Sequence, residues 1–289
     1  MASPYATSKR RRFVRLFGPA IIVGYTLACT IVFLAQRKML YIVPDAPRGM
    51  VGRGQVVNVP GGHPMLWLEG APDAPVVVYF HGNAGQIADC AWTADIFAAR
   101  NIGFAAVEYP GFGLARGQGT PDEASIYASA RAAIAHLKTG LNIAPERLVL
   151  MGRSLGSGVA VQLASEGVGT KLVLLTPYTS IPDLAQAIYP WFPAWLLAQD
   201  RFNSADKAPR IPIPVLVVHG MKDEIVPVGM GLALAARFPS ASFVGVADVG
   251  HDEIWDRMHV QRRILDFTQG LNVLPDDGAR HFKAETDAD

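Results

Sequence analysis

The chain has 289 residues, which fits one large domain or two small ones, and its 50% hydrophobic share is enough for a sizeable core. A formal net charge of +1 gives no electrostatic reason to expect a nucleic-acid partner. The two cysteines, Cys29 and Cys90, fall in a predicted membrane segment and in a predicted helix, so we expect no structural disulfide.

The first element in chain order is an apolar segment behind a basic cluster. Residues 9–15 carry five Lys or Arg, and residues 16–35 are twenty residues without a charge, about the length that spans a bilayer. Arg37 and Lys38 follow the segment. The positive-inside rule therefore predicts a cytoplasmic N-terminus at 1–15, a transmembrane helix at 16–35 and the rest of the chain on the opposite side.

Three other interpretations of the apolar segment are weaker. A cleaved signal peptide would have a shorter apolar region and a clear A-x-A site. The sequence Thr26-Leu27-Ala28-Cys29 resembles a lipoprotein box, but further apolar residues follow the cysteine. A buried core helix would not need the basic flank. We therefore interpret residues 16–35 as an uncleaved signal anchor.

The next residues predict the start of a separate domain, for which we expect the bounds 39–270. A proline-punctuated connector leads to two short strands, Gln55–Val59 and Met65–Leu68, with Pro60-Gly61-Gly62 as the hairpin turn between them. Val76–Phe80 is a continuous β-branched and aromatic run, which is typical of a strand buried on both faces.

Helical and strand patterns then alternate. A helix is predicted over Ile87–Arg100 and a strand over Gly103–Val107. Thr120-Pro121-Asp122-Glu123 has the pattern of a capping box with proline at the first helical position. Apolar residues at helical spacing continue that helix to Leu137, and Gly140 stops it.

The second half of the domain repeats this alternation around one insertion. Strands are predicted at Leu148–Met151, Leu172–Leu175, Val215–Val218 and Ser242–Val246, with helices over Ser157–Glu166 and from Asp252 to about Phe267. Residues 178–212 are rich in proline and aromatic residues, which predicts a cap of short pieces folded over the sheet. The polar, net negative residues 275–289 are expected to form a flexible tail.

At least five strand–helix alternations predict an α/β fold with a mostly parallel sheet and helices on both faces. In such sheets the reacting groups lie in loops beyond the carboxyl ends of the strands. Asn83, Ser154, Asp223 and His251 each come just after a predicted strand. We therefore expect these four residues to meet at one edge of the sheet.

Ser154 is the candidate nucleophile because it lies in a G-x-S-x-G sequence between a strand and a helix. The strained turn needs small residues at Gly152 and Gly156, and Gly158 is expected to let the helix pack closely on neighbouring strands. The helix N-terminus favours negative charge that develops near the serine. The alternative is a glycine-rich turn in which the serine is incidental.

A serine nucleophile needs a neighbouring base, and His251 is the best placed of seven histidines, because it follows the last predicted strand in a glycine-led loop. His81 and His219 also end strands, but their rings are expected to pack under loops. Asp223, in the turn after Val215–Val218, is the candidate orienting acid. Its alternatives are Glu224, Asp200 and Asp248, or a turn aspartate that bonds only its own backbone.

Acyl transfer also needs two backbone N–H groups directed at the developing oxyanion. We expect one from Leu155 and the other from Asn83, with Ala84 as the second choice for the latter. The aromatic residues Tyr178, Trp191 and Trp195 either form an acyl pocket in the cap or only pack on the sheet, and the sequence leaves both interpretations open.

The sequence lacks the common motifs for dinucleotide and metal binding. The sequence Gly111-Phe112-Gly113 has Arg116 where a dinucleotide-binding motif needs its third glycine. The sequence contains no C-x-x-C or H-E-x-x-H, so we expect no metal and no cofactor.

Five sequence pieces together resemble the α/β-hydrolase superfamily, and more narrowly its membrane-anchored abhydrolase-domain serine hydrolases. They are His81-Gly82-Asn83-Ala84-Gly85, Tyr109-Pro110-Gly111-Phe112-Gly113, the stretch Gly152-Arg153-Ser154-Leu155-Gly156-Ser157-Gly158, residues 219–227 and Gly250-His251. Some relatives that cleave acyl thioesters carry an N-terminal cysteine cluster, which this chain lacks. A depalmitoylase activity is therefore not carried over.

The resemblance implies a serine hydrolase with Ser154, Asp223 and His251 as catalytic residues. Together with the anchor and the aromatic cap, it predicts cleavage of an ester or thioester with a small-molecule or lipid-like acyl group. A serine peptidase or amidase on the same fold is the alternative enzyme. A membrane scaffold that has the fold without the activity is the alternative outside enzymes.

Overall fold

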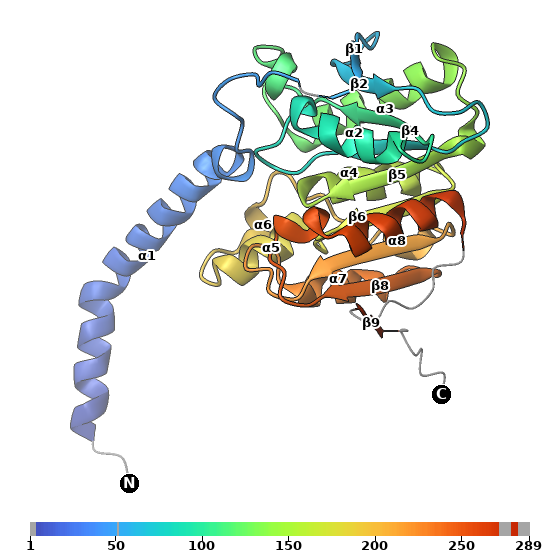
Figure 1. Cartoon of the computed structure of the whole chain (residues 1–289). Coiled ribbons are helices and arrows are strands. Elements are labelled where there is room, and N and C mark those ends of the chain that lie inside the picture. Colours follow the sequence, from blue (N-terminus) through green and yellow to red (C-terminus); the bar gives the residue numbers. More distant parts are fainter. Residues whose placement is uncertain (1–3, 51, 272–278, 283–289) are drawn as a thin grey trace.

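The computed structural model describes residues 4–50, 52–271 and 279–282, with side chains described from residue 18 to residue 271 except at residue 51. At its centre lies a nine-stranded sheet in the order β1-β2-β4-β3-β5-β6-β7-β8-β9 (Figure 1). The strands are β1 (Gln55–Val57), β2 (Met65–Leu68), β3 (Val76–Phe80), β4 (Gly103–Val107), β5 (Leu148–Arg153), β6 (Lys171–Leu175), β7 (Val215–Gly220), β8 (Ala241–Val246) and β9 (Ala279–Phe282). The block from β4 to β8 is parallel, whereas β1, β2 and β9 pair antiparallel. The expected hairpin and the mostly parallel sheet are confirmed.

Helices cover both faces of this sheet. They are α2 (Ala91–Ala98), α3 (Glu123–Thr139), α4 (Leu155–Ser165), α7 (Val228–Ala235) and α8 (Met258–Gln269). The pleat of β3 shows the two layers: Val76, Val78 and Phe80 pack in one cluster with α3, α4 and α7, while Val77 and Tyr79 pack in another with α2 and α8. Both layers are apolar, which explains why β3 lacks polar alternation.

Four predicted helix starts are wrong. Ile87–Cys90 form a 3₁₀ turn before α2, and α4 begins at Leu155 rather than Ser157. The N-cap of α3 is Asp122, not Thr120. The Asp122 carboxylate accepts a hydrogen bond from Ser125 N at 2.7 Å, and the Ser125 hydroxyl oxygen accepts one from Asp122 N at 3.1 Å. This reciprocal pair satisfies the N–H groups of Asp122 and Ser125, so the capping box lies two residues later than predicted. The last helix begins at Met258 rather than Asp252, after a 3₁₀ turn over Glu253–Asp256.

The predicted tail contains one element of the sheet. Residues 279–282 form β9, which pairs antiparallel with β8, so the expectation of a flexible tail is wrong for these residues and β8 is not the last strand. The other residues of 275–289 lie outside the described part of the chain.

Helix α1 (Pro4–Leu40) precedes the sheet and extends away from it (Figure 1). Its segment Gly18–Leu40 is long and apolar enough to cross a membrane. Its mean hydropathy is 2.0, and only 6% of its most apolar 18 residues are buried in the structure. This segment overlaps the predicted span of 16–35 and continues to Leu40 at its domain end; the side chains before residue 18 lie outside the described part of the chain. An apolar helix of this kind can serve as a membrane anchor.

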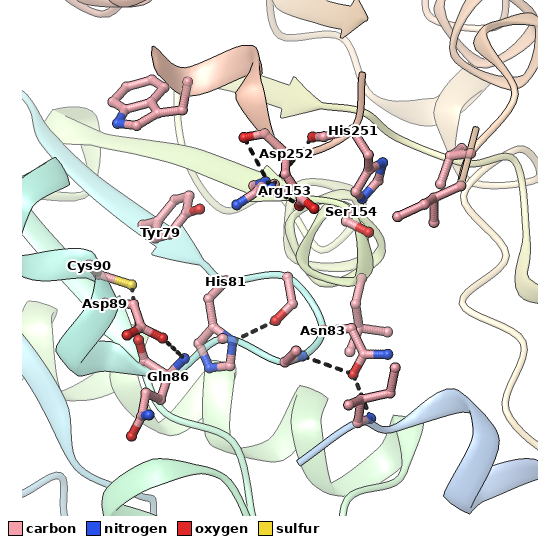
Figure 2. Close-up of a pocket in the computed structure, with 18 of the residues that line it drawn as sticks. Tyr79, His81, Asn83, Gln86, Asp89, Cys90, Arg153, Ser154, His251 and Asp252 are labelled. Atoms are coloured by element: carbon pink, nitrogen blue, oxygen red, sulfur yellow. Dashed lines mark hydrogen bonds and ion pairs between the residues drawn. The ribbon is translucent and has the colours of Figure 1, made fainter. Parts of the chain in front are cut away.

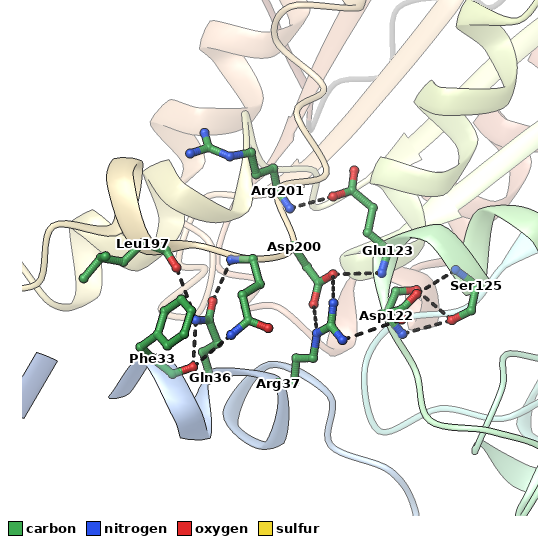
Figure 3. Close-up of polar contacts among 10 residues, drawn as sticks. Phe33, Gln36, Arg37, Asp122, Glu123, Ser125, Leu197, Asp200 and Arg201 are labelled. Atoms are coloured by element: carbon green, nitrogen blue, oxygen red, sulfur yellow. Dashed lines mark hydrogen bonds and ion pairs between the residues drawn. The ribbon is translucent and has the colours of Figure 1, made fainter. Parts of the chain in front are cut away.

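The end of α1 is attached to the cap by polar contacts (Figure 3). The cap contains the short helices α5 (Ile181–Ile188) and α6 (Ala194–Leu197), as its prolines predict. Gln36 Nε2 donates to Leu197 O at 3.2 Å, and Gln199 N donates to Gln36 Oε1 at 2.8 Å. Arg37 Nε donates to Asp200 Oδ2 at 2.9 Å. These contacts link the candidate span directly to the cap.

Replacing Arg37 with alanine should destabilise this junction. Asp200 is 4% exposed, and without Arg37 its carboxylate would lose both guanidinium hydrogen bonds and keep the Glu123 N–H at 3.0 Å. A buried charge that loses a partner costs on the order of 1–3 kcal/mol. Thermal unfolding in detergent should show a lower midpoint for Arg37→Ala than for the matched change at the exposed neighbour Lys38. Equal midpoints would contradict a stabilising role for the ion pair.

Candidate active site

Ser154 lies on a strained turn between β5 and α4. Its φ of 49° and ψ of −118° are unusual for a residue other than glycine, and its N–H donates to Leu175 O on β6 at 2.9 Å. A Cβ atom at Gly156 would overlap the carbonyl oxygen of Phe80, and one at Gly152 would overlap the carbonyl oxygen of Gly156. The expected need for small residues at these two positions is confirmed.

Gly158 serves a different purpose from the one expected. Its close neighbours are the hydroxyl group of Tyr178 and the ring of Phe202, both from the segment that follows β6, rather than residues of the neighbouring strands. The glycine thus lets Tyr178 reach the first turn of α4, where its hydroxyl donates to Leu155 O at 3.2 Å.

Asp223 and His251 are paired as the sequence predicts. His251 Nδ1 lies 2.7 Å from Asp223 Oδ2, and Asp223 Oδ1 accepts from the backbone N–H groups of Ile225 at 2.9 Å and Val226 at 2.8 Å. The Asp223 side chain is fully buried. A carboxylate in this position fixes the tautomer with the proton on Nδ1, which leaves Nε2 able to accept a proton.

The ionisation of Asp223 follows from its partners. Burial raises the pKa of this carboxyl, but hydrogen bonds from His219, His251 and the Val226 N–H outweigh burial and hold the pKa well below its usual range. His219, whose Nε2 lies 3.2 Å from Asp223 Oδ2, packs under the loop as expected. Asp223 is therefore a carboxylate throughout the physiological pH range.

The alternatives to Asp223 lie elsewhere. Asp248 is paired with Lys222 at 2.7 Å on the surface, and Asp200 is paired with Arg37. Glu224 is exposed and is not among the residues within hydrogen-bonding distance of His251.

Ser154 and His251 line one cavity of about 440 Å³ (Figure 2). Leu155, Asn83 and Tyr178 line it as well, so five of the predicted site residues meet there, with Asp223 behind His251. Further lining residues come from α5, from the end of α1 and from the chain directly after α1; they are Ile181, Leu184, Leu40 and Ile42.

Trp191 and Trp195 are not among the residues that line this cavity. Both belong to the segment between Pro190 and Leu197, and their side chains are exposed on the outer surface of the cap. The cavity lining therefore contradicts an acyl pocket that includes these two tryptophans, which is one of the two interpretations that the sequence leaves open. The cap instead lines the cavity with aliphatic residues of α5. The spacing of these residues in the sequence does not distinguish them from ordinary core residues.

The loop after β3 contains the second expected oxyanion donor, Asn83. The N–H of Ala84, the second choice, donates to Ile42 O at 3.0 Å, whereas no hydrogen bond from the Asn83 N–H is recorded among the described residues. Leu155 is the first residue of α4, where a backbone N–H has no preceding turn to bond with. Asn83 and Leu155 both line the cavity, so their N–H groups remain the candidate oxyanion donors.

The Asn83 side chain has a role that the sequence did not indicate. Its Oδ1 accepts from Ile42 N at 2.8 Å and its Nδ2 donates to Leu40 O. The His81 ring packs at a tilt of 31° against Tyr109, with centroids 4.0 Å apart, and its Nδ1 lies 2.9 Å from Gly82 O. The end of α1 therefore fixes the loop through the Asn83 side chain, and His81 packs beneath it.

Arg153 has a role at the site that we did not predict from the sequence. Its Nη2 donates to Asp252 Oδ1 at 2.6 Å and lies 3.4 Å from His251 O, so it links the nucleophile turn to the histidine loop (Figure 2). The sequence did offer one indication of this role, because Arg153 is a variable residue of the G-x-S-x-G motif and directly precedes the serine.

Replacing Arg153 with methionine should lower kcat by roughly two- to fivefold, because an ion pair whose Asp252 side chain is 76% exposed contributes about 0.2–1 kcal/mol and its loss loosens the histidine loop. Arg153→Lys should recover part of the rate. Steady-state hydrolysis of a p-nitrophenyl ester is the measurement, with circular dichroism as the control for folding. An unchanged kcat in Arg153→Met would show that Arg153 does not position His251.

Comparison with known proteins gives the family. A family model described as serine aminopeptidase, S33, matches residues 71–204. An uncharacterized protein of Mycobacterium tuberculosis (strain CDC 1551) is 32% identical over 235 residues, which cover 78% of this chain and 83% of the relative. Alpha/beta hydrolase domain-containing protein 17C of Mus musculus is 30% identical over 197 residues, which cover 65% of this chain and 58% of that relative. The chain belongs to the α/β-hydrolase superfamily, and it is a hydrolase with the expected fold.

Solved structures share this fold at low identity. A puromycin-hydrolyzing peptidase of Mycobacterium tuberculosis superposes with a TM-score of 0.61 at 19% identity, covering 76% of this chain and 40% of that chain. An esterase of a Rhodococcus species superposes with a TM-score of 0.57 at 18% identity, covering 76% of this chain and 99% of that chain. At such identities the likeness concerns the fold alone.

Proposed function

We propose that this protein is a membrane-anchored serine hydrolase that cleaves an ester or thioester through an acyl-enzyme on Ser154. The observation that carries the proposal is the 2.7 Å hydrogen bond between His251 Nδ1 and buried Asp223, with His251 lining the same cavity as the strained Ser154. A strained serine, an oriented imidazole and a carboxylate form the arrangement that activates a hydroxyl group.

The proposed reaction has two steps. His251 Nε2 accepts the proton of Ser154 Oγ as that oxygen attacks the carbonyl carbon, and the N–H groups of Leu155 and Asn83 donate to the oxyanion. The C–O or C–S bond then breaks, and the leaving alcohol or thiol takes the proton from His251. Water attacks the acyl-enzyme with His251 again as base, which releases the acid and restores Ser154.

The lining of the cavity supports an apolar acyl group. Leu40, Ile42, Ile181 and Leu184 are aliphatic, and two of them belong to the end of α1 or to the residues directly after it. The basic cluster at residues 9–15 supports a cytoplasmic N-terminus, with the hydrolase domain of residues 39–270 on the opposite side of the membrane.

Labelling with a fluorophosphonate probe tests the proposal, since only an activated serine forms the phosphonyl adduct. Cleavage after Arg153 and Lys171 yields a peptide of residues 154–171 that starts with Ser154 and also contains Ser157 and Ser165. We expect the adduct on Ser154. A folded protein without any adduct, or with the adduct on Ser157, would contradict the proposal, and the former would favour a non-catalytic scaffold.

A peptidase or amidase is the second candidate, because the matched family model is one of serine aminopeptidases. The two candidates share Ser154 and differ in the leaving group. A panel that contains p-nitrophenyl esters, acyl thioesters and aminoacyl anilides distinguishes them. Preference for the anilides, measured as kcat/KM, would favour the peptidase.

A further inference from the structure

The cap contains a tract without charge. Residues 184–199, between Asp183 and Asp200, include no Asp, Glu, Lys or Arg. They nevertheless expose large apolar side chains: Ile188 (51%), Tyr189 (39%), Trp191 (49%), Trp195 (66%) and Leu196 (61%). Contiguous exposed apolar residues of this kind mark a binding surface rather than ordinary protein surface.

This tract packs against the candidate membrane span. Phe192 and Ala194 form an apolar cluster with Cys29 of α1, and Tyr25 donates its hydroxyl proton to Trp191 O at 3.0 Å. The ribbon shows α5 and α6 near the domain end of α1 (Figure 1). On the same stretch of α1, Leu27 and Leu34 are 59% and 75% exposed, so the apolar surface of the cap continues onto the helix.

The contacts set the depth of the cap relative to the span. They extend along α1 from Tyr25 to Gln36, which corresponds to about 16 Å at a rise of 1.5 Å per residue. The hydrocarbon core of a bilayer is about 30 Å thick. If Gly18–Leu40 spans the membrane, the contacts from Cys29 to Gln36 lie in the half of the span next to the hydrolase domain, and the Tyr25 contact lies just beyond its middle.

We propose that residues 184–199 are embedded in the phospholipid bilayer beside the anchor, so that the hydrolase is held against the membrane by two elements rather than one. The partner is a lipid bilayer because the tract is continuous with a span that itself needs lipid. The tract carries no charge, as the hydrocarbon region requires, and the charged residues Asp183 and Asp200 bracket it.

The embedded tract also gives the active site a substrate class, and this step rests on the proposed function. Helix α5 contributes Ile181 and Leu184 to the catalytic cavity and Ile188 to the exposed tract. Leu40 and Ile42 bring the end of the anchor to the same cavity. The apolar wall of the cavity therefore continues into the membrane-facing surface, which suits a lipid whose acyl chain enters from the leaflet.

Tryptophan quenching tests the embedding without any catalytic readout. The full chain is reconstituted in phosphatidylcholine vesicles, with and without lipids that carry bromine in their acyl chains. We expect bromine to quench part of the wild-type fluorescence, and this quenching to be largely lost in Trp191→Phe/Trp195→Phe. The control Trp67→Phe, at a position that is 5% exposed on β2, should keep it. Equal quenching in the wild type and the double variant would overturn the proposal.

A second comparison tests the route of the substrate. Ile188→Glu/Leu196→Glu places charges in the tract, and Leu114→Glu/Met258→Glu is the matched control at exposed apolar sites outside it. Because a charge in the hydrocarbon region is strongly disfavoured, we expect hydrolysis of a long-chain lipid ester in vesicles to fall by roughly tenfold or more in the first variant only. Hydrolysis of a soluble short-chain ester should be unchanged in both.

The outcomes separate this inference from the proposed function. Quenching in the Ser154→Ala variant should equal that of the wild type, so quenching without any hydrolysis would refute the function alone. Hydrolysis without quenching from Trp191 and Trp195 would refute the embedding alone. If Ile188→Glu/Leu196→Glu kept its lipid-ester activity but changed the protein from an oligomer to a monomer, the partner of the tract would be a second copy of the chain. That result would also overturn the proposal.

Discussion

The Ser154→Ala variant is expected to lose activity by a factor on the order of 10⁴ or more in kcat, because removal of the nucleophile leaves only binding and oxyanion stabilisation. The change removes one oxygen atom from a residue whose backbone conformation is set by other contacts, namely Ser154 N with Leu175 O and the close approach of Gly156 to β3. The fold should therefore be unaffected. Hydrolysis of a p-nitrophenyl ester and the thermal midpoint are the two measurements.

Ser157→Ala is the matched control for this loss. Ser157 lies on the first turn of α4, where its hydroxyl donates to Ser154 O at 2.6 Å, and it is not among the residues that line the cavity. Its removal costs one local hydrogen bond of about 1 kcal/mol and no reacting group. We expect Ser157→Ala to retain most of the wild-type kcat. Comparable losses in both variants would indicate damage to the turn rather than removal of a nucleophile.

The second large effect is expected for Asp223→Asn. An asparagine amide can donate to His251 Nδ1, which would place the imidazole proton on Nε2 and leave no base next to Ser154. A loss of roughly 10⁴ in kcat is expected, with KM changed little because Asp223 lies behind His251 and is not among the cavity-lining residues. Glu224→Gln, one residue further along the exposed turn, should keep its activity. A wild-type rate in Asp223→Asn would exclude an orienting role.

Asp223 also predicts a pH dependence of stability. Hydrogen bonds from His219, His251 and Val226 N outweigh the effect of burial and lower the pKa of Asp223 in the folded protein, so ionised Asp223 favours folding. This contribution is present above the ordinary aspartate pKa of about 3.9 and is lost as the pH falls below it. Denaturant unfolding should show a shallower loss of stability on acidification in Asp223→Asn. Identical slopes would contradict a lowered pKa.

The sequence predicts the central sheet and the position of the site well, because both depend on local pattern. Val76–Phe80 and Gly103–Val107 are strands with the predicted bounds, since continuous apolar runs are typical of buried parallel strands. Ser154, Asp223 and His251 each follow a strand, and the carboxyl ends of parallel strands lie at one edge of a sheet. Chain order alone therefore predicts that the three residues meet.

The features that the sequence did not predict depend on contacts between distant segments. The Asn83 side chain bonds to Leu40 and Ile42, and Arg153 reaches Asp252. Neither contact leaves a periodic signal in the sequence. Strand β9 is short and polar, and its pairing with β8 requires the chain to return to the sheet edge.

The sequence also did not predict which way the aromatic side chains of the cap face. Proline and aromatic residues predict short pieces, but they do not determine which face of the cap lies toward the cavity. Trp191 and Trp195 lie on the outside, whereas Leu184 lines the cavity. The amino-acid composition of the cap is the same whether Trp191 and Trp195 face the cavity or the outside. The packing of Phe192 and Ala194 on α1 decides between these two orientations.

The most direct test of the account is the detection of the acyl-enzyme itself. The protein is mixed with a p-nitrophenyl ester, quenched in acid during turnover, digested after Arg153 and analysed by mass spectrometry. We predict an acyl group on Ser154 in the peptide of residues 154–171, and none in the Ser154→Ala variant. Rapid ester turnover with an acyl group on another residue, or equal turnover by Ser154→Ala, would contradict the account.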